Sequence, residues 1–380
     1  MMVKKVEFYK HSLDESDINR AVEVLRSVFL TTGKTVKEFE ESLSVYLEVK
    51  NAVGITSCTA ALHLCLKAWN IGPGDEVITT PMSFCATSNS VMLAGAEPVF
   101  VDVEEDTGNI DASLIEKKIT KKTKAIMPVH LYGQMCDMKK IREIADKYDL
   151  VVIEDSAHCL EGIRDGARPG QLGDAACFSF YATKNITSGE GGAIALNNKD
   201  KADLLGILRS HGIDKAAADR YTKLYQHWDM TELGWKYNMD NIKAALLIGQ
   251  LQRADSLLEG REEVCTLYEK GLSGVKGIRL MKKLPGSKHA RHLFTFQVDP
   301  EIRDSVLMAL QKRGVGVAVN YRAVHLLKYY RERFGYKEGD YPVAERIGAS
   351  TITIPMYPKL ELEEIEYVIE SVIEEVKKSK

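Results

Sequence analysis

The sequence lacks the features that would place it in a membrane, a disulfide-rich or a zinc-binding class. No apolar run approaches the roughly 18 residues that span a bilayer. The opening MMVKKVEFYKHS has no apolar stretch typical of a secretory signal. The seven cysteines include no CxxC pair, which argues against a zinc site and a disulfide framework. We therefore expect a protein of the reducing cytoplasm with no metal and no membrane partner.

A surplus of charge of one sign is also missing. The 51 Lys and Arg residues and the 54 Asp and Glu residues leave a formal net charge of −3, which gives no reason to expect a nucleic-acid partner. Neither a GxGxxG nor a GxxxxGKS/T motif occurs, so dinucleotide and nucleoside-triphosphate sites are not indicated. The 380 residues, 45% of them hydrophobic, are enough for roughly two to three domains with a large core.

Short apolar runs alternate with helical patterns between residues 52 and 196. The runs are AVGIT, EVITT, EPVFVDV, KAIMPVH, LVVIED, ACFSF and GAIAL. They are apolar at nearly every position, as in strands that helices cover on both faces. Strands that alternate with helices predict right-handed βαβ units and an α/β fold with a mostly parallel sheet.

Two helices are predicted before this region. Ser16 is a candidate N-cap for a helix whose apolar face would consist of Ile18, Val22, Leu25 and Val28. A second helix is predicted over residues 36–46, where apolar residues again recur at helical spacing.

The pattern changes after a long helical stretch over residues 239–274. GIRLM, HLFTFQV and VGVAV predict strands of a second unit. Helices are also expected near residues 301–313, 342–349 and 360–378. We place a boundary near residue 250. Residues 1–250 then form N-terminal helices and a large α/β domain, and residues 251–380 form a smaller α+β domain.

Polar residues follow two of the predicted strands. VVIEDSAH places Glu154 and Asp155 at the carboxyl end of a strand, where ligand sites of open parallel sheets lie. In FSFYATKNITSGEGGAI, a strand ends near Ser179 and a short loop brings Lys184, which can form a Schiff base with a carbonyl cofactor. Taken singly, each segment has a plainer interpretation: one acid caps a helix while the other is solvated, and the lysine lies on the surface of a hairpin.

Two more strand ends carry candidate ligand groups. GITSCTAALHL places Ser57, Cys58 and Thr59 at a helix N-terminus, which can hold a phosphate or can be an ordinary N-cap by Ser57. TTPMSFCATSN places Phe84 after a strand, either as a core residue or as a ring that stacks on a flat cofactor.

Together, these segments predict a site for pyridoxal 5′-phosphate (PLP), a phosphorylated aromatic aldehyde with a ring nitrogen. Lys184 would form the imine, Asp155 would keep the ring nitrogen protonated through its opposite charge, and the helix N-terminus would hold the phosphate. The lysine would then serve as the general base for a 1,3-proton shift.

The chain resembles the PLP-dependent sugar aminotransferases of the DegT/StrS type, within fold-type I. The resemblance covers nearly the whole chain and rests on the segments FLTTGKTVKEFE, VGITSCTAALHL, GDEVITTPMSFCAT, EPVFVDV, VHLYGQMCDM, IEDSAH, LGDAACFSFYATKNITSGEGGAI, LGWKYNMDNIKAAL and NYRAVHL. It implies the fold-type I architecture, in which helices sandwich a mostly parallel sheet and a smaller α+β domain follows. It also implies transfer of an amino group from L-glutamate to a nucleotide-linked keto sugar, a 4-keto hexose being favoured, in amino-sugar or polysaccharide biosynthesis.

The resemblance implies roles for individual residues. Lys184 would be the Schiff-base lysine, Asp155 would face the pyridine nitrogen, and His158 would lie near the ring hydroxyl, where many relatives have Gln. Phe84 would lie over the ring. The residues that would hold the phosphate are Ser179, Cys58 and Thr59.

The resemblance also implies a homodimer with composite active sites. Asn238, in LGWKYNMD, matches an asparagine that reaches the phosphate in the partner subunit, although it is also a candidate cap for the helix that begins near residue 239. We interpret one face of that helix as a packing surface of the dimer. The residues of this face are Ile242, Ala245, Leu246 and Gln250.

Three segments supply candidate substrate contacts. Tyr321 and His325, in NYRAVHL, match a substrate-side motif, although Leu327 and Lys328 stand where relatives usually have Gln-Pro. His211, in RSHGI, is a candidate contact whose plainer interpretation is a structural histidine. Candidates for contacts with the diphosphate, each also explained by a surface role, are Arg291 and Arg322.

Other functions stay open at this point. A PLP-dependent lyase or desulfurase needs a reactive cysteine on a mobile loop, and the sequence places none in that way. The family also contains dehydratases, in which histidine replaces the lysine. A non-catalytic regulatory protein that keeps the fold would be favoured by loss of Lys184 or Asp155. Both residues are present, so aminotransfer is favoured.

Overall fold

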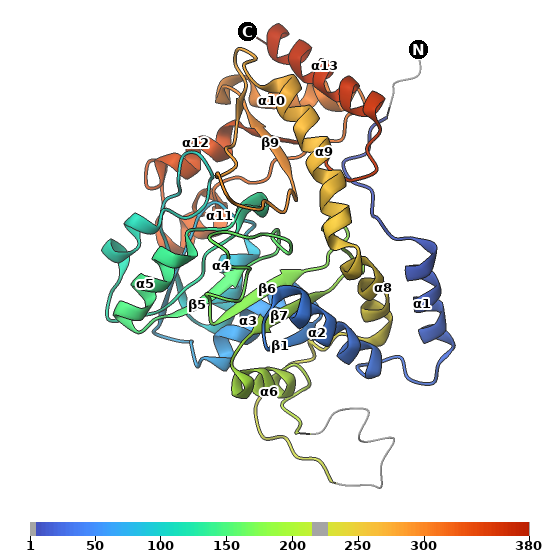
Figure 1. Ribbon diagram of the computed structural model, residues 1–380. Coiled ribbons are helices and arrows are strands. Elements are labelled where there is room, and N and C mark those ends of the chain that lie inside the picture. The colour runs from blue at the N-terminus through green and yellow to red at the C-terminus, as the bar shows by residue number, and fades with distance from the viewer. Residues whose placement is uncertain (1–4, 215–226, 380) are drawn as a thin grey trace.

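The computed structural model describes residues 5–214 and 227–379 (Figure 1). In this part of the chain a seven-stranded sheet has the order β1-β7-β6-β5-β4-β2-β3, and a smaller sheet has the order β10-β9-β8. The strands of the large sheet are β1 (Asn51–Ile55), β2 (Glu76–Thr79), β3 (Glu97–Phe100), β4 (Thr123–Ile126), β5 (Val151–Asp155), β6 (Ala175–Ser179) and β7 (Gly192–Leu196). The strands of the small sheet are β8 (Arg279–Leu280), β9 (Phe294–Gln297) and β10 (Thr351–Ile354).

The large sheet is mostly parallel, which confirms the prediction. Strands β3, β2, β4, β5 and β6 pair in parallel, and β7 is antiparallel to both β6 and β1. Asp155, the last residue of β5, is in register with Cys177 of β6, and β6 ends two residues later at Ser179. The carboxyl ends of these two strands therefore meet at one edge of the sheet, where ligand sites form in such folds.

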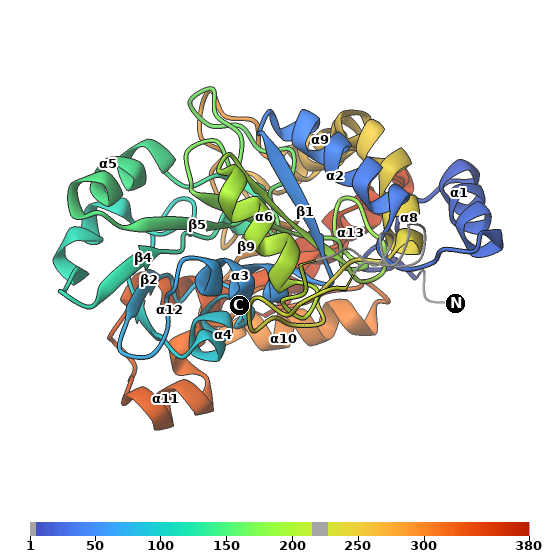
Figure 2. The ribbon, with the colours of Figure 1, turned by 90° about the horizontal axis from the view of Figure 1, so that it is seen from below.

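Helices cover both faces of the large sheet (Figures 1 and 2). They are α2 (Lys34–Leu47), α3 (Cys58–Ala68), α4 (Ala86–Ala94), α5 (Met138–Tyr148), α6 (Lys199–Leu208) and α8 (Asn241–Gln252). In β6, Ala175 and Cys177 pack with α3 on one face, and Ala176 and Phe178 pack with α2 and α8 on the other. Because successive side chains of a strand point to opposite faces, such a strand is apolar at every position.

A second, smaller unit follows α8 and lies at the top of Figure 1. Its helices are α9 (Ala254–Leu272), α10 (Pro300–Lys312), α11 (Lys328–Phe334), α12 (Pro342–Ser350) and α13 (Leu362–Lys378). Of these, α9, α10 and α13 pack on the small antiparallel sheet, as expected of an α+β unit. In contrast, α11 and α12 contribute to a cluster that includes Phe100 and Leu131 of the large unit. The boundary predicted near residue 250 lies inside α8 and stays a prediction. Among the described residues, no helix combines the length and apolarity needed to cross a membrane.

The small sheet differs from the prediction in one strand. VGVAV was expected to form a strand, but its described contacts are isolated bridges between Val6 and Val315 and between Ala318 and Thr353. The third strand is instead β10, which pairs with β9. Its sequence, TITI, is short and directly follows α12, so no separate strand signal stands out there.

The first helix, α1 (Glu15–Arg26), has a cap and a buried face that differ from those predicted. Asp14, not Ser16, is the N-cap, and it forms a capping box with Asp17. Ala21 and Val24 pack on α8, whereas the predicted face is exposed at Ile18. Exposed with it are Leu25 and Val28. Asp17 is buried and bound to Arg253 at 2.7 Å, so the helix buries an acid together with its partner.

The face of α8 that was assigned to a dimer interface is partly covered within the same chain. Ala245, with Ile242 and Leu246 beside it, packs against α1. Gln250 is fully buried, and its amide pairs with the backbone of Thr187 through both its oxygen and its nitrogen. Ala245 and Gln250 are thus buried within the chain, whereas Ile242 and Leu246 are partly buried, so the predicted packing surface stays a prediction.

Candidate active site

Lys184 lies beside the carboxyl ends of β5 and β6, with Asp155 and Cys58 close enough to act on its charge. Burial lowers the pKa of Lys184 to about 8, and the opposing influences of Cys58 and Asp155 are smaller. An amine with a pKa near 8 is partly neutral at physiological pH, and the neutral amine is the nucleophilic form. The structure thus brings the predicted Schiff-base lysine and the predicted aspartate together.

Asp155 is a buried carboxylate with neutral hydrogen-bond donors. Its oxygens accept from the hydroxyl of Thr87 at 2.7 Å and from the backbone N–H of Ala157 at 3.1 Å. These neutral donors orient the carboxylate, whose charge also acts on the nearby ammonium of Lys184. A buried charge requires a partner of opposite sign. A protonated pyridine nitrogen meets that requirement. Thr87 was not identified from the sequence.

His158 joins the same cluster through both ring nitrogens. Its Nδ1 accepts from the backbone N–H of Tyr132 at 3.2 Å, so in the neutral ring Nε2 carries the hydrogen. Nε2 then donates to the hydroxyl of Tyr321 at 3.0 Å. Burial, and then the charge of Lys184, hold the pKa of His158 well below its usual value, which keeps the ring neutral. His158 and Tyr321 are therefore brought to the lysine.

The residues predicted to hold the phosphate lie at the first turn of α3 and at the end of β6, beside β7. Ser57 caps the helix, because its hydroxyl accepts from the N–H of Ala60 at 3.2 Å. The interpretation of Ser57 as an N-cap is therefore confirmed. The N–H groups of Cys58 and Thr59 belong to the first turn, where amides have no partner within the helix. Such a turn attracts anions, and a phosphate fits this donor set.

Ser179 lies next to this turn because β7 presses against it. Gly192 pairs with Ser179 across the sheet, and a Cβ on Gly192 would stand 2.4 Å from the carbonyl carbon of Ser57. Only glycine allows the strand to approach the helix so closely. The hydroxyl of Ser179 and the amides of the first turn of α3 therefore border the same place.

Phe84 is 58% exposed, so the core interpretation of this ring is wrong. Its ring centroid is 5.9 Å from that of Tyr321, with the planes tilted by 45°.

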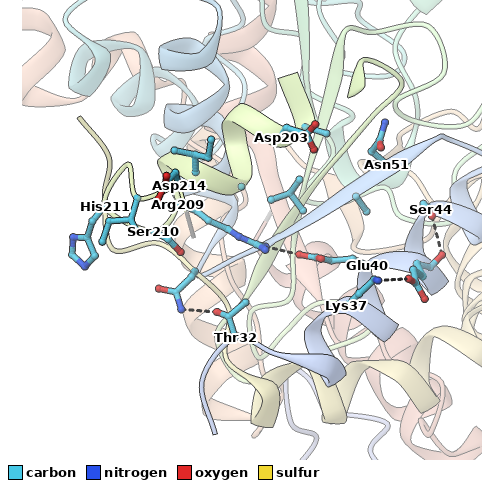
Figure 3. A pocket seen from close by; sticks show the side chains of 18 of the residues that line it. Thr32, Lys37, Glu40, Ser44, Asn51, Asp203, Arg209, Ser210, His211 and Asp214 are labelled. Atoms are coloured by element: carbon cyan, nitrogen blue, oxygen red, sulfur yellow. Dashed lines mark hydrogen bonds and ion pairs between the residues drawn. The ribbon is translucent and has the colours of Figure 1, made fainter. Parts of the chain in front are cut away.

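Asn238 and His211 line a groove of about 620 Å³ between α2, α6 and β1, which Lys184 and Asp155 do not line (Figure 3). Asn238 does not cap α8, because Asp240 does so by accepting from the N–H of Lys243. Its side-chain nitrogen donates to Thr32 at 2.7 Å, and its side-chain oxygen is buried without a partner. His211 is exposed and points away from the other labelled residues of the groove.

His325 and Arg291 have their side chains committed within the fold. The imidazole of His325 is fully buried, with Nε2 3.0 Å from a carboxylate oxygen of Glu345 and its ring against Tyr341. Arg291 is buried and binds Glu262 and Glu269, so its charge is balanced internally rather than presented to a diphosphate or to solvent. The structure brings neither side chain to Lys184.

One residue that sequence reasoning missed contacts Lys184 directly. Nε2 of His292 lies 3.4 Å from Nζ of Lys184, and the histidine is buried. It comes from the segment HARHLF, between α9 and β9. The sequence offered one signal for this residue, a group of histidine and arginine residues just before a strand. That pattern is not specific for any reaction.

The profile of the DegT/DnrJ/EryC1/StrS aminotransferase family matches residues 11–373. The chain belongs to this family. It is 38% identical over 386 residues to the spore coat polysaccharide biosynthesis protein SpsC of Bacillus subtilis, covering 99% of both chains. It is 36% identical over 374 residues to the UDP-4-amino-4-deoxy-L-arabinose–oxoglutarate aminotransferase of Shewanella sediminis, covering 96% of both.

A solved structure agrees with the fold of this family member. Spr1654 of Streptococcus pneumoniae, described as a candidate sugar aminotransferase, superimposes in its PMP form with a TM-score of 0.94 at 33% identity, over 99% of this chain and 100% of that one. The same protein has been solved in its PLP form. The predicted fold class and PLP as cofactor are confirmed, and we conclude that this chain is a sugar-nucleotide aminotransferase.

Proposed function

We propose that this enzyme transfers the amino group of L-glutamate to the carbonyl carbon of a nucleotide-linked 4-keto sugar, with a hexose favoured. The observation that carries the proposal is the pairing of Lys184 and Asp155 in one buried site beside the neutral side chains of His158 and Tyr321. The Shewanella sediminis relative supports the choice of ring carbon and donor, since its name specifies a 4-amino sugar and oxoglutarate.

Each residue of the site has a part in this proposal. When bound, PLP supplies a carbonyl that takes up the amino group and a ring that delocalises the electrons of the broken C–H bond. Lys184 holds and releases the proton at its Nζ, for which the pKa of about 8 is well matched to neutral pH. Asp155 holds the protonated ring nitrogen, and the first turn of α3 holds the phosphate together with Ser179.

Tyr321 is proposed to orient the sugar. Because Nε2–H of His158 donates to its hydroxyl oxygen, the hydroxyl keeps its own hydrogen for donation to a ligand. Neutral donors of this kind suit the hydroxyls and carbonyl of a ketosugar. Arg322 is exposed beside Tyr321 and stays the candidate contact for the diphosphate. Phe84, exposed next to the same ring, is proposed to lie over PLP.

The proposal includes a homodimer in which Asn238 completes the phosphate site of the partner subunit. Its support is the position of Asn238 in a groove that Lys184 and Asp155 do not line. His211, in the same groove, is proposed to approach substrate from there. The proposed location is the cytoplasm, which suits the seven free thiols.

The desulfurase alternative loses support from the cysteines. Six of the seven are buried, and Cys85 is half-buried. Burial raises the pKa of the thiols of Cys58, Cys136, Cys159, Cys177 and Cys265. A thiol with a raised pKa is a poor nucleophile, since the thiolate is the reactive form.

The experiment follows labelled nitrogen. The PLP-loaded enzyme is given L-glutamate labelled with ¹⁵N and, in separate reactions, nucleotide-linked 4-keto hexoses, 4-keto pentoses, 3-keto hexoses and ordinary 2-oxo acids. We expect ¹⁵N in a 4-amino sugar nucleotide, with 2-oxoglutarate released in equal amount, and no transfer by the Lys184→Ala variant. Efficient exchange between amino acids and 2-oxo acids, without turnover of any nucleotide sugar, would contradict the proposal.

A further inference from the structure

A chain of four side chains leads from Lys184 into the protein interior. Nζ of Lys184 lies 3.4 Å from Nε2 of His292, and Nδ1 of His292 lies 3.2 Å from the side-chain oxygen of Asn185. The side-chain nitrogen of Asn185 donates to both carboxylate oxygens of Glu161, at 3.1 and 3.0 Å. His292, Asn185 and Glu161 are buried. Of these four residues, only Lys184 has been given a chemical role in the site described above.

The surroundings of Asn185 fix the orientation of its amide. The amide nitrogen faces the carboxylate of Glu161 and also the backbone carbonyl of Ala290, at 2.7 Å. The carbonyl of Ala290 can only accept a hydrogen bond, so the nitrogen must lie on that side and the oxygen must face His292. Because this oxygen is an acceptor, Nδ1 of His292 carries the hydrogen.

His292 is consequently a neutral ring whose Nε2 presents a lone pair to Lys184. Burial, followed by the charge of Lys184 and by His158, holds the pKa of His292 well below its usual value. Smaller influences in the same direction come from Arg261 and His289. With Nδ1 protonated and the ring neutral, Nε2 can only accept a hydrogen bond from Nζ.

The backbone around His292 is anchored on two sides. The N–H of Ala290 donates to Gly133 at 2.8 Å, and the N–H of His292 donates to Tyr132 at 3.0 Å. The guanidinium of Arg261, in α9, donates to the carbonyl of Arg291 at 3.2 Å and reaches that of His292 at 3.4 Å. These contacts give the imidazole a fixed position, which a residue that orients a reactive group requires.

We propose that His292 is a catalytic residue that accepts a hydrogen bond from Nζ of Lys184 and fixes its direction, and that Asn185 and Glu161 are positioning residues that hold the required tautomer. The inference rests on the role proposed for Lys184. The arrangement is similar to a catalytic triad: His292 orients the nucleophile Lys184, and Asn185 orients His292 in turn. The hydrogen bond from Nζ to Nε2 of His292 fixes the position of the lysine side chain. The proposal adds no covalent step to the reaction.

The test measures the pKa of Lys184 in the enzyme freed of PLP, by competitive acetylation across pH followed by peptide mass spectrometry. An acceptor stabilises the ammonium form, so its loss lowers the pKa. Against a wild-type value of about 8, we expect His292→Leu to lower the pKa by about one unit and His292→Gln, which keeps an acceptor oxygen, to restore most of it. His289→Gln is the control in the same segment, because Nδ1 of His289 accepts from the N–H of Arg291 rather than from Lys184.

A second variant acts through the tautomer alone. Asn185→Leu removes the acceptor for Nδ1–H, and we expect the ¹⁵N resonances of His292 to lose the Nδ1–H form while the pKa of Lys184 falls as in His292→Leu. Unchanged pKa values in both leucine variants, or an equal shift in His289→Gln, would overturn the proposal. Because these readouts need no PLP, they are independent of whether PLP binds Lys184, which borohydride labelling of the loaded enzyme decides separately.

Discussion

Gly192 lies against the peptide that joins Ser57 to Cys58, so closely that a Cβ on Gly192 would stand 2.4 Å from the carbonyl carbon of Ser57 and 2.7 Å from the nitrogen of Cys58. The contacted atoms are backbone and cannot rotate away. Any side chain on Gly192 must therefore displace either β7 or the first turn of α3, and that turn is the proposed phosphate site.

Gly192→Ala is expected to weaken PLP binding by about tenfold or more, because each 1.4 kcal/mol of lost contact raises the dissociation constant tenfold. The measurement is a PLP titration followed by absorbance and fluorescence. Gly72→Ala is the matched control, since its Cβ would meet only ordinary contacts at 3.4 Å and beyond. Equal PLP affinity in the wild type and Gly192→Ala would contradict the proposed phosphate site.

Asp155→Asn is expected to keep bound PLP but to lose roughly a hundredfold or more in turnover, a barrier increase of about 2.7 kcal/mol. The amide keeps the shape but removes the charge that holds the ring nitrogen protonated. Thr87→Val, which removes one neutral donor to the same carboxylate, should lose much less. Turnover of the Asn variant near that of the wild type would rule out the role given to Asp155.

Mixing two inactive variants tests the composite site. Lys184→Ala and Asn238→Ala proteins are dissociated, mixed and reassociated, so that mixed dimers carry one site with both residues intact. About a quarter of the wild-type activity is then expected, because half of the dimers are mixed and each has one of two sites. If Asn238 acts within its own subunit, activity will not exceed that of the Asn238→Ala protein alone.

Glu161 should make the stability of the PLP-free protein depend on pH. Burial raises its pKa to about 7, above its usual value in an unfolded chain. The folded protein therefore binds more protons than the unfolded chain between roughly pH 4.5 and 7, so this contribution is present at low pH and is lost as pH rises through 7. Relative to Glu161→Gln, the free energy of unfolding of the wild type should fall by about 3 kcal/mol across that range. The free energies of unfolding of both proteins are measured by urea unfolding at each pH. A difference between wild type and Glu161→Gln that is the same at all pH values would contradict the raised pKa of Glu161.

The central sheet could be predicted because its strands are buried on both faces. Ala175 to Phe178 are apolar toward α3 on one side and toward α2 and α8 on the other, and such a run is visible without knowing its neighbours. The placement of Lys184 and Asp155 followed from the same argument, since both follow strands that end at one edge. Their roles stay predictions.

Features that depend on distant partners could not be predicted. The buried face of α1 is decided by α8, more than 200 residues later, and the same contact removes Ala245 from the surface. His292 is 108 positions from Lys184, and the grouping of histidine and arginine around it does not reveal such a contact. Asp240, rather than Asn238, caps α8, because the cap depends on the backbone conformation at the start of the helix.

The attachment of PLP to Lys184 is tested most directly by reducing the PLP-loaded enzyme with borohydride and mapping the labelled peptide by mass spectrometry. We expect one pyridoxyl group, carried by Lys184 in the peptide that contains YATKNITSGEGG. Lys199→Ala, which removes an exposed lysine paired with Asp203, should be labelled as the wild type is, and Lys184→Ala should carry no label. A pyridoxyl group on any other lysine of an active enzyme would contradict the account.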